Sequence, residues 1–496
     1  MAIPKVMGTE IEYGITVEND RDFDPIASCV LLVNAYREDH DARILWDYDQ
    51  ENPLADARGF QVDGEKYTPN QQENIARNKT LVNGARYYVD HAHPEYSCPE
   101  VTNPRDLVIH EKAGEHIVEL SRRAASAMLP HGKQLLIHKN NSDRKGSSYG
   151  SHENYLMDRR TSFKRITEQL IPFFVSRQLF CGAGKVGSEN RGQPCDYQLS
   201  QRADFFETEV ALDTMVKRPI INTRDEPHAD REKYRRLHVI VGDSNMCEFA
   251  IWLRQGATAL LLSMIEDGAM DRDLSLRDPV RAIKAVSHDL SLRLELDLAG
   301  GGRRSALQLQ REFLEMALRY AQRGEAPDWA PEILQHWGEV LDALERDPYE
   351  LSDRLDWVAK KVMIEHFMER RGLDWGAPQV AMMDLQYHDL RPERGLYQLL
   401  LRQGLVRRIT SDEEIRTAVS EPPSDTRAYF RGQCLKKYGS EVFGVNWDSI
   451  SFGIVDEPVK RVMMAEPLKG SKAHVQGLLG TFELLQGCNS QEVVAT

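Results

Sequence analysis

Four segments of this sequence alternate apolar side chains with ionisable ones, and this alternation restricts the possible folds more than any other feature. The segments are 8–15 (GTEIEYGI), 86–98 (RYYVDHAHPEYSC), 151–157 (SHENYLM) and 235–243 (RRLHVIVGD). Neighbouring side chains of a β-strand point to opposite faces, so each segment would have one apolar and one ionisable face. Together they predict a sheet whose apolar face is core and whose polar face gathers carboxylate, imidazole and guanidinium groups.

The first segment places two carboxylates side by side. Glu10 and Glu12 share one face of the expected strand, whereas Ile11, Tyr13 and Ile15 share the other. Two carboxylates on one face repel each other, and a cation bound between them would relieve the repulsion. This segment alone fits a metal-binding strand and a solvent-facing edge strand equally well.

The second segment combines a guanidinium, a phenol and a carboxylate in one row. Arg86, Tyr88 and Asp90 share a strand face, and a turn at His93 would aim Glu95 toward them. This combination is typical of an anion-binding site beside a nucleophile or a base. The alternative is a polar strand end, but so many ionisable groups in so short a stretch favour a functional site.

The remaining two segments add imidazole groups. His152 shares a face with Asn154, and His238 shares a face with Arg236. A single histidine at a strand edge is more often a hydrogen-bonded core residue than a ligand, so the prediction depends on the recurrence of such groups on four strands. Glutamate and histidine together suit Mg²⁺ or Mn²⁺ that holds nucleotide phosphates, and arginine adds bidentate phosphate contacts.

Several familiar motifs are rejected. The GxGxxG match at 182–187 is followed by SENRGQPCD, which does not open a helix as a dinucleotide site requires. The GxSxG match at 146–150 follows KNNSDRK, which is not the apolar strand of a nucleophile elbow. There is no Walker A pattern, so a nucleotide would bind here without a P-loop.

Composition excludes further classes of protein. The seven cysteines are scattered without a CxxC pair, which argues against a disulfide scaffold or a structural zinc site and suits the cytoplasm. The net charge of −14 disfavours general nucleic-acid binding. The longest apolar run, near 257–265, is too short to span a membrane.

The order of the patterns predicts an α+β fold. Strands are expected at 6–15, 86–98, 134–157 and 236–242, and helices at 105–128, 247–267, 306–322, 331–346 and 353–371. Residues 20–85 read as a polar, irregular stretch, whose part at about 40–80 is expected to be an inserted loop. The Pro-Pro pair at 422–423 predicts a boundary between a catalytic domain, 1–420, and a small C-terminal domain, 421–496.

On these residues the sequence resembles the pupylation enzymes of actinobacteria, a Pup ligase/deamidase family in the carboxylate–amine ligase superfamily that includes glutamine synthetase. The resemblance covers nearly the whole chain and rests on the motifs GTEIEYGI, NGARYYVDHAHPEYS, KNN, YGSHENYLM, SQRADF, INTRDEPHAD, YRRLHVIVGDSN, PPSDTRAYFRG, NWDS and EPLKGSKAHV. VDHAHPEYS, the stretch with ENPLADARGF and the ending PLKGSKAHV are similar to the deamidase/depupylase branch. CGAGKV and GDSNM are closer to the ligase branch.

The resemblance implies a fold and an activity. The fold would be a large domain with a curved antiparallel sheet of the glutamine-synthetase-like type packed on helices, plus a small C-terminal domain. The activity would be hydrolysis at the C-terminal residue of Pup: deamidation of Pup-Gln to Pup-Glu and cleavage of the isopeptide bond between Pup and a substrate lysine. ATP, or ADP plus phosphate, and Mg²⁺ would be cofactors, and Pup, pupylated proteins and the bacterial proteasome would be functional partners. An ATP-dependent Pup–protein ligase of the same fold is the alternative.

The resemblance also assigns roles to single residues. Asp90 matches the catalytic aspartate, either as a nucleophile or as a general base. The positions that match metal ligands are Glu10, Tyr88, Glu95, His152 and His238. The positions that match nucleotide contacts are Gly8, Thr9, Glu10, Ile11, Glu12, Arg86, Ser97, Cys98, Asn154, Arg236 and Trp447.

Two further expectations concern the substrate. Pup is acidic, so a chain of net charge −14 needs a local basic groove to bind it, and Arg427 and Arg431, at helical spacing, are candidates for its lining. A solvated helix face is the alternative for these two arginines. The stretch at about 40–80 is expected to lie over the site and to control nucleotide turnover or substrate entry.

Overall fold

The computed structural model describes residues 1–38, 44–49, 51–64, 68–190, 192–213, 217–453 and 459–475, and these form a mixed α/β structure with several sheets. Its centre is a six-stranded sheet in which every neighbouring pair is antiparallel. In spatial order the strands are β15 (Tyr234–Val239), β10 (Ser151–Asp158), β1 (Met7–Glu12), β8 (His93–Ser97), β7 (Arg86–Asp90) and β6 (Asn78–Thr80).

All four alternating segments lie in this sheet, as predicted, and the second of them forms the β7–β8 hairpin. The register brings their polar residues into neighbouring rows. Glu10 pairs with His152 on one side and Ser97 on the other, and Asn154 pairs with His238. Because strand side chains alternate, Glu10, Ser97, His152, Asn154 and His238 face the same side of the sheet.

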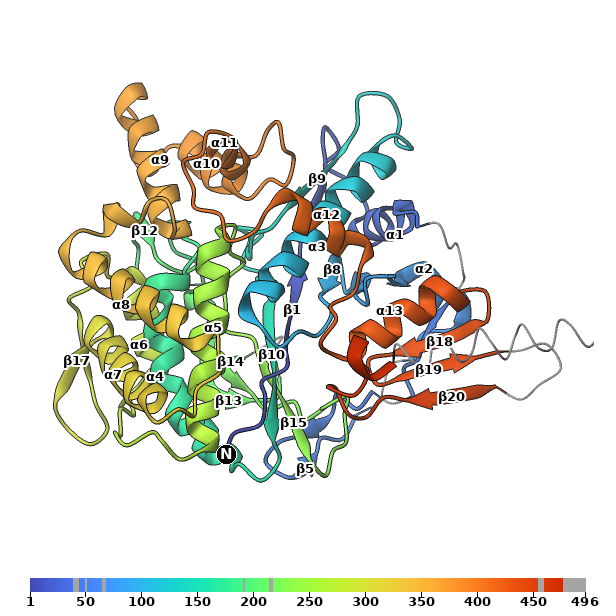
Figure 1. Ribbon diagram of the computed structural model, residues 1–496. Coiled ribbons are helices and arrows are strands. Elements are labelled where there is room, and N and C mark those ends of the chain that lie inside the picture. The colour runs from blue at the N-terminus through green and yellow to red at the C-terminus, as the bar shows by residue number, and fades with distance from the viewer. Residues whose placement is uncertain are drawn as a thin grey trace, which may run out of the picture.

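The opposite face of the sheet is the protein core. Ile11, Tyr87, Tyr96 and Tyr155 on this face are fully buried, and helices α1, α3 and α5 pack against it. Figure 1 shows the helices from α4 to α8 gathered on one side of the sheet and the C-terminal elements on the other. The helices are α1 (Pro25–Ala35), α2 (Gln71–Arg77), α3 (Pro104–Ser126), α4 (Phe163–Cys181), α5 (Glu248–Glu266), α6 (Pro279–His288), α7 (Ala306–Gln322), α8 (Ala330–Arg346), α9 (Asp356–Arg371), α10 (Pro378–Tyr387), α11 (Leu396–Arg402), α12 (Asp412–Ser420) and α13 (Arg427–Tyr438).

The predicted helices at 105–128, 247–267, 306–322, 331–346 and 353–371 are confirmed as α3, α5, α7, α8 and α9. The prediction that 20–85 is irregular is wrong in part, because α1 lies inside it. The Asp24 side chain caps this helix by accepting hydrogen bonds from the backbone N–H groups of Ile26 and Ala27. Its inner residues, among them Leu32 and Val33, are fully buried in the core.

A second, four-stranded sheet lies near the C-terminus, with the order β20 (Lys460–Met463), β19 (Ser449–Phe452), β18 (Val442–Asn446) and β3 (Leu45–Trp46). It packs with α13 around a small hydrophobic cluster that includes Leu435, Val445 and Ile450. Strand β3 comes from the predicted inserted loop and pairs in parallel with β18. Strand β3 of the insertion therefore belongs to the C-terminal sheet, while β6 lies at the edge of the central sheet; residues 39–43, 50 and 65–67 of that stretch lie outside the described residues. The boundary near 421 stays a prediction.

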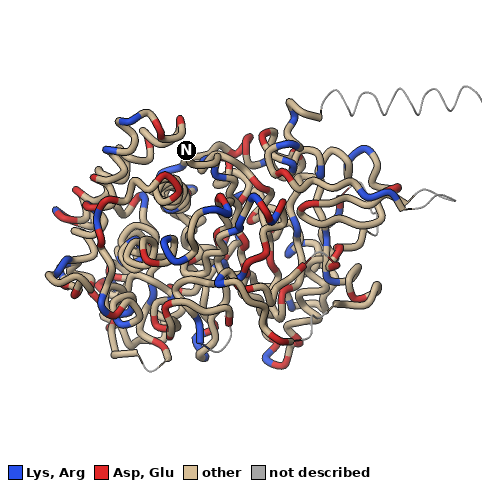
Figure 2. The backbone as a smooth tube through the Cα atoms, turned by 90° about the horizontal axis from the view of Figure 1, so that it is seen from below, with Lys and Arg blue, Asp and Glu red and all other residues tan. Residues whose placement is uncertain are grey.

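The remaining strands form five two-stranded sheets: β2 (Gly14–Val17) with β9 (Leu135–His138), β4 (Ala55–Asp56) with β5 (Phe60–Gln61), β11 (Lys185–Val186) with β12 (Tyr197–Gln198), β13 (Phe206–Ala211) with β14 (Arg218–Asn222), and β16 (Glu295–Asp297) with β17 (Arg303–Ser305). Acidic and basic residues are interspersed over the view of Figure 2, so the net negative charge is not gathered in one part of it. Within the part of the chain that is described, no helix has the length and apolarity needed to cross a bilayer.

Candidate active site

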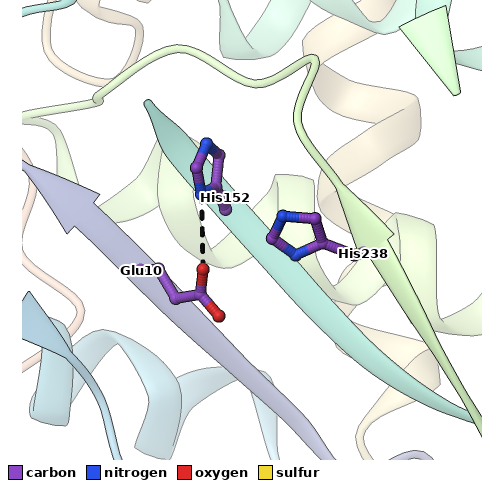
Figure 3. A group of neighbouring side chains, drawn as sticks. All are labelled: Glu10, His152 and His238. Carbon is purple, nitrogen blue, oxygen red and sulfur yellow. Dashed lines mark hydrogen bonds and ion pairs between the residues drawn. The ribbon is translucent and has the colours of Figure 1, made fainter. Parts of the chain in front are cut away.

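Three side chains on the polar face of the sheet form a potential metal site. Glu10 of β1, His152 of β10 and His238 of β15 each offer a donor atom, and these atoms all lie within 4.8 Å of one another (Figure 3). His152 Nδ1 lies 3.3 Å from Glu10 Oε2. All three belong to the predicted set of metal ligands, and their donors suit a divalent cation.

Asn154 lies between two members of this group. Its side-chain N–H donates to Glu10 Oε1 at 2.9 Å, and its Oδ1 lies 2.9 Å from His238 Nδ1 and accepts from Arg236 Nη1 at 2.8 Å. One amide therefore fixes the orientation of both the carboxylate and the imidazole. This arrangement is typical of residues that hold metal ligands in place without binding the metal.

The electrostatics of the group favour metal-binding protonation states. Burial alone would raise the pKa of Glu10, but His152, His238 and Arg236 outweigh this effect and hold its pKa well below the ordinary value. Burial lowers the pKa of His238 well below its usual range. A carboxylate that stays ionised and an imidazole that stays neutral are the forms that bind a cation.

A second group of carboxylates lies beside the first. Oxygen atoms of Glu12, Asp90 and Glu95 lie within 4.8 Å of one another, and the Tyr88 hydroxyl donates a hydrogen bond to Glu95. Burial, together with the charges of Asp90, Glu10 and Glu12, raises the pKa of Glu95 well above its ordinary value. A cation next to Glu12 and Glu95 would remove this repulsion between carboxylates. Glu95 and its hydrogen-bond partner Tyr88, both predicted metal ligands, therefore lie where a cation could bind.

Asp90, the predicted catalytic residue, lies at the rim of this group, where β7 ends. Its side chain is 38% exposed, and its Oδ1 lies 3.1 Å from His91 Nδ1. Burial would raise the pKa of Asp90, but the hydrogen bond and charge of His91, with further positive charge from His152 and Arg86, lower it. Asp90 is thus an ionised carboxylate that solvent and substrate can reach.

Five of the predicted nucleotide-binding residues line one pocket between the central sheet and the C-terminal elements: Gly8, Glu10, Asn154, Arg236 and Trp447. His228 also lines this pocket, and the sequence interpretation missed it. It has a left-handed backbone, with φ of 46°, and burial lowers its pKa to about 3. The imidazole is therefore neutral at the wall of this pocket.

The other predicted nucleotide contacts are placed differently. Ile11 is fully buried on the core face, and the Thr9 hydroxyl lies 2.7 Å from Cys98 Sγ in the interior. These three residues would reach a ligand only through their backbone. Ser97 lies on the polar face, where its hydroxyl is 3.4 Å from Glu95 Oε1.

Arg86 is held by neighbouring aromatic rings. Its guanidinium carbon lies 4.0 Å from the centroid of the Trp46 ring and 3.8 Å from that of Tyr88. Its N–H groups donate to Asn78 Oδ1 and to the hydroxyl of Tyr48. The residue is 7% exposed, so in this structure it supports strand β7 and does not line the pocket.

Two arginines near Glu12 were not identified from the sequence. They are Arg202 and Arg218, which both contact Ser148: Arg202 donates to its hydroxyl at 3.2 Å and Arg218 to its carbonyl at 3.0 Å. Burial, followed by the charge of Arg218, lowers the pKa of Arg202 to about 9. Among the described residues neither forms an ion pair, so an anion such as a phosphate would compensate their charges. Arg202 lies in the SQRADF motif and Arg218 begins strand β14, but neither position belongs to the four alternating segments from which the site was predicted.

The expected basic groove at Arg427 and Arg431 is not found. Both side chains are buried and form ion pairs with Glu100, Arg427 at 2.9 Å and Arg431 at a shorter distance. Arg431 also donates to the carbonyl oxygens of Gly84 and Trp447. The two arginines fasten α13 to the central sheet, and they are unavailable to an acidic substrate.

Comparisons with known proteins show the family to which the chain belongs. The family model for Pup-ligase protein matches residues 5–451. The chain is 52% identical over 486 residues to a depupylase from Acidothermus cellulolyticus, with 96% of each chain covered. It is 46% identical over 486 residues to a Pup deamidase/depupylase from Mycolicibacterium smegmatis, with 97% of each chain covered.

Two solved structures of Pup ligases share the fold. The complex of the Pup ligase PafA with Pup matches with a TM-score of 0.82 and 32% identity, covering 99% of this chain and 94% of that one. PafA in complex with ADP matches with a TM-score of 0.75 and 34% identity, covering 86% of this chain and 97% of that one. This chain belongs to the Pup-ligase protein family.

Proposed function

We propose that this chain is an amide hydrolase that acts on the C-terminal residue of Pup, deamidating Pup-Gln and cleaving the isopeptide bond between Pup and a substrate lysine. The observation that carries the proposal is the exposed, ionised carboxylate of Asp90 at the rim of a group of potential cation ligands. The names of the two relatives, depupylase and Pup deamidase/depupylase, support the same reaction. Both substrates are cleaved at a side-chain amide, so one site serves both.

The residues present fit a nucleotide and Mg²⁺. Glu10, His152 and His238 would hold one cation, and Glu12 with Glu95 would hold a second. The pocket lined by Gly8, Asn154, Arg236 and Trp447 would hold ATP, or ADP plus phosphate, and the related ligase structure with ADP supports this assignment. When bound, the cations would neutralise phosphate and polarise a nearby oxygen.

Asp90 can promote cleavage of the amide by two mechanisms, as a nucleophile or as a general base. As a nucleophile, its carboxylate adds to the carbonyl carbon, the C–N bond breaks, and water then hydrolyses the anhydride. As a general base, it takes a proton from a water molecule that attacks the same carbon. In both routes the nitrogen leaves as ammonia from Pup-Gln or as the lysine amine from the isopeptide, and the carboxyl group of the Pup side chain is released.

Several expectations accompany this proposal. The enzyme would work in the cytoplasm with Pup and pupylated proteins as partners and with a functional link to the proteasome, and without nucleic acid or membrane. The fold would be of the glutamine-synthetase-like α+β type, with a catalytic domain at 1–420 and a small domain at 421–496. The complex of a related ligase with Pup supports Pup as the partner.

The alternative is an ATP-dependent Pup ligase of the same fold, which the match to two ligase structures favours. The protein would be incubated with Mg-ATP and either Pup-Gln or a pupylated protein, while Pup is followed by mass spectrometry and ADP is counted. The proposal predicts Pup-Glu and free target protein without an equivalent amount of ADP. A Pup–lysine adduct formed from Pup-Glu, with one ADP for each bond, would instead identify a ligase.

A further inference from the structure

The turn that follows the catalytic strand is held in a strained conformation. His91, directly after Asp90, has a left-handed backbone with φ of 50°, which is uncommon for a residue with a side chain. The turn is anchored on both sides of this residue: Cys29 Sγ donates to the Ala92 carbonyl at 3.4 Å, and the His93 ring stacks on Tyr149 with centroids 4.3 Å apart. Strain that the surroundings maintain in this way is a feature of functional sites.

Packing does not explain a histidine at this position. The side chain of His91 is 68% exposed, and its Nδ1 meets Oδ1 of Asp90 at 3.1 Å. The neighbouring imidazoles are engaged elsewhere, because His152 is bound to Glu10 and His238 is buried against Asn154. Among the described residues of the site, His91 is thus the imidazole that lies at the solvent side of the reacting carboxylate.

Amide cleavage needs a general acid at the solvent side of Asp90. The nitrogen of a broken amide is a strong base, and the C–N bond breaks readily only when the nitrogen receives a proton as it leaves. The target protein with its lysine must approach from solvent, since the other side of the sheet is core. The acid must therefore lie at the exposed rim of the site, beside Asp90.

Building on the proposed function, we propose that His91 is the general acid that protonates the leaving nitrogen. Its Nδ1 holds Asp90, so its Nε2–H is the group that can face the substrate. When the tetrahedral intermediate collapses, the electron pair of the C–N bond moves to nitrogen, and the nitrogen takes the proton from Nε2. The amine departs, and His91 is left neutral.

The proton balance closes in both routes open to Asp90. If Asp90 attacks directly, neutral His91 takes a proton from the water that hydrolyses the anhydride, and both residues return to their starting forms. If Asp90 acts as a base, it later releases to solvent the proton that it took from water, and the vacant Nε2 of His91 takes a proton from solvent, which restores the imidazolium. The net reaction consumes one water and releases a carboxylic acid and an amine.

The test replaces His91 by glycine and varies the leaving group. Glycine adopts a φ of 50° without strain, so His91→Gly keeps the turn. Two substrates are compared with the full-length enzyme and Mg-ATP: Pup joined to lysine by an isopeptide bond, and Pup carrying a nitrophenyl ester on the same carboxyl group. The ester releases a phenolate that needs no proton. We expect the variant to cleave the isopeptide about a hundredfold more slowly and the ester within about threefold of the wild-type rate.

Added imidazole provides a second measurement. The exposed position of His91 leaves room for a free imidazole in the glycine variant, which should restore isopeptide cleavage in proportion to its concentration and leave ester cleavage unchanged. His131→Gln, which removes an exposed histidine outside the site, serves as the control and should behave like the wild type. Equal loss on both substrates, or no rescue by imidazole, would overturn the role of His91. Failure of the wild-type enzyme to cleave the isopeptide would instead overturn the proposed function.

Discussion

The guanidinium of Arg86 stacks on the phenol ring of Tyr88, with 3.8 Å between its central carbon and the ring centroid. Trp46 also lies against the same guanidinium, 4.0 Å from its central carbon, and contacts Trp447 edge to face, with ring centroids 5.4 Å apart. Since Trp46 lies on β3, which pairs with β18, this stack joins the C-terminal sheet to the strand that carries Asp90. Strand β3 of the insertion is therefore a structural support of the site.

Replacing Arg86 by lysine tests this support. Lysine keeps the charge but loses the planar stack and the paired hydrogen bonds to Asn78, so we expect the free energy of unfolding to fall by about 2 kcal/mol and amide cleavage to slow. Urea unfolding and steady-state kinetics measure the two effects. Trp46→Phe is the matched control, because it keeps an aromatic face on the guanidinium. Equal stability of Arg86→Lys and the wild type would contradict the role assigned to the stack.

The amide of Asn154 should control metal affinity without binding the metal. Because it orients both Glu10 and His238, Asn154→Ala is expected to weaken Mg²⁺ or Mn²⁺ binding by about 10-fold to 100-fold. Calorimetric titration of the nucleotide-bound protein with each cation measures this change. Gln335→Ala, at an exposed position far along the chain, should leave the affinity unchanged. Unchanged affinity in Asn154→Ala would show that the Glu10 group is not the cation site.

Glu100 should be essential for the attachment of α13. Its replacement by glutamine leaves the buried guanidinium groups of Arg427 and Arg431 without a counter-charge, which costs about 3–5 kcal/mol of stability. The control is Glu421→Gln, which breaks a surface pair with Lys436 and should cost less than about 1 kcal/mol. Denaturant unfolding of both variants gives the comparison. A similar loss of stability in the two variants would mean that the buried ion pairs of Glu100 contribute little to the free energy of unfolding.

The same carboxylate makes stability depend on pH. Burial opposes its ionisation, but Arg431 and Arg427 lower the pKa of Glu100 to about 2 in the folded protein. An unfolded chain has the ordinary, higher value, so the contribution is present above about pH 4.5 and is lost as the pH falls toward 2. We expect a loss of about 2 kcal/mol between about pH 6 and about pH 3 that is absent in Glu100→Gln. Unfolding curves of the two proteins at both pH values test this; parallel losses would contradict it.

The strand pattern predicted much of the site because a period of two fixes the face of every residue. Glu10, His152 and His238 could be assigned to one surface, and the sheet then brings them together. The same period placed Asp90 on one face with Tyr88, at the end of β7, whereas the catalytic role proposed for it comes from the family resemblance. Strand period says nothing about residues on loops, which is why Arg202 remained unnoticed.

Contacts between residues far apart in the sequence explain most of the incorrect predictions. Helical spacing correctly placed Arg427 and Arg431 on one face of α13, but their partner Glu100 is more than three hundred residues away, and no local pattern shows that this face is buried. Strand β3 has two residues and pairs with β18 across most of the chain, so it carries no detectable alternation. Helix α1 was hidden because the polar stretch around it dominated the interpretation of that region.

The most direct test of the account is the fate of Pup-Gln with the Asp90→Asn variant in the presence of Mg-ATP. Mass spectrometry of Pup would follow the conversion of its C-terminal amide to a carboxyl group, and nucleotide binding would be measured on the same samples. We predict that the variant binds nucleotide like the wild type but converts Pup-Gln at least about a hundredfold more slowly. Conversion at a rate close to that of the wild type would show that Asp90 is not the reacting carboxylate and would contradict the account.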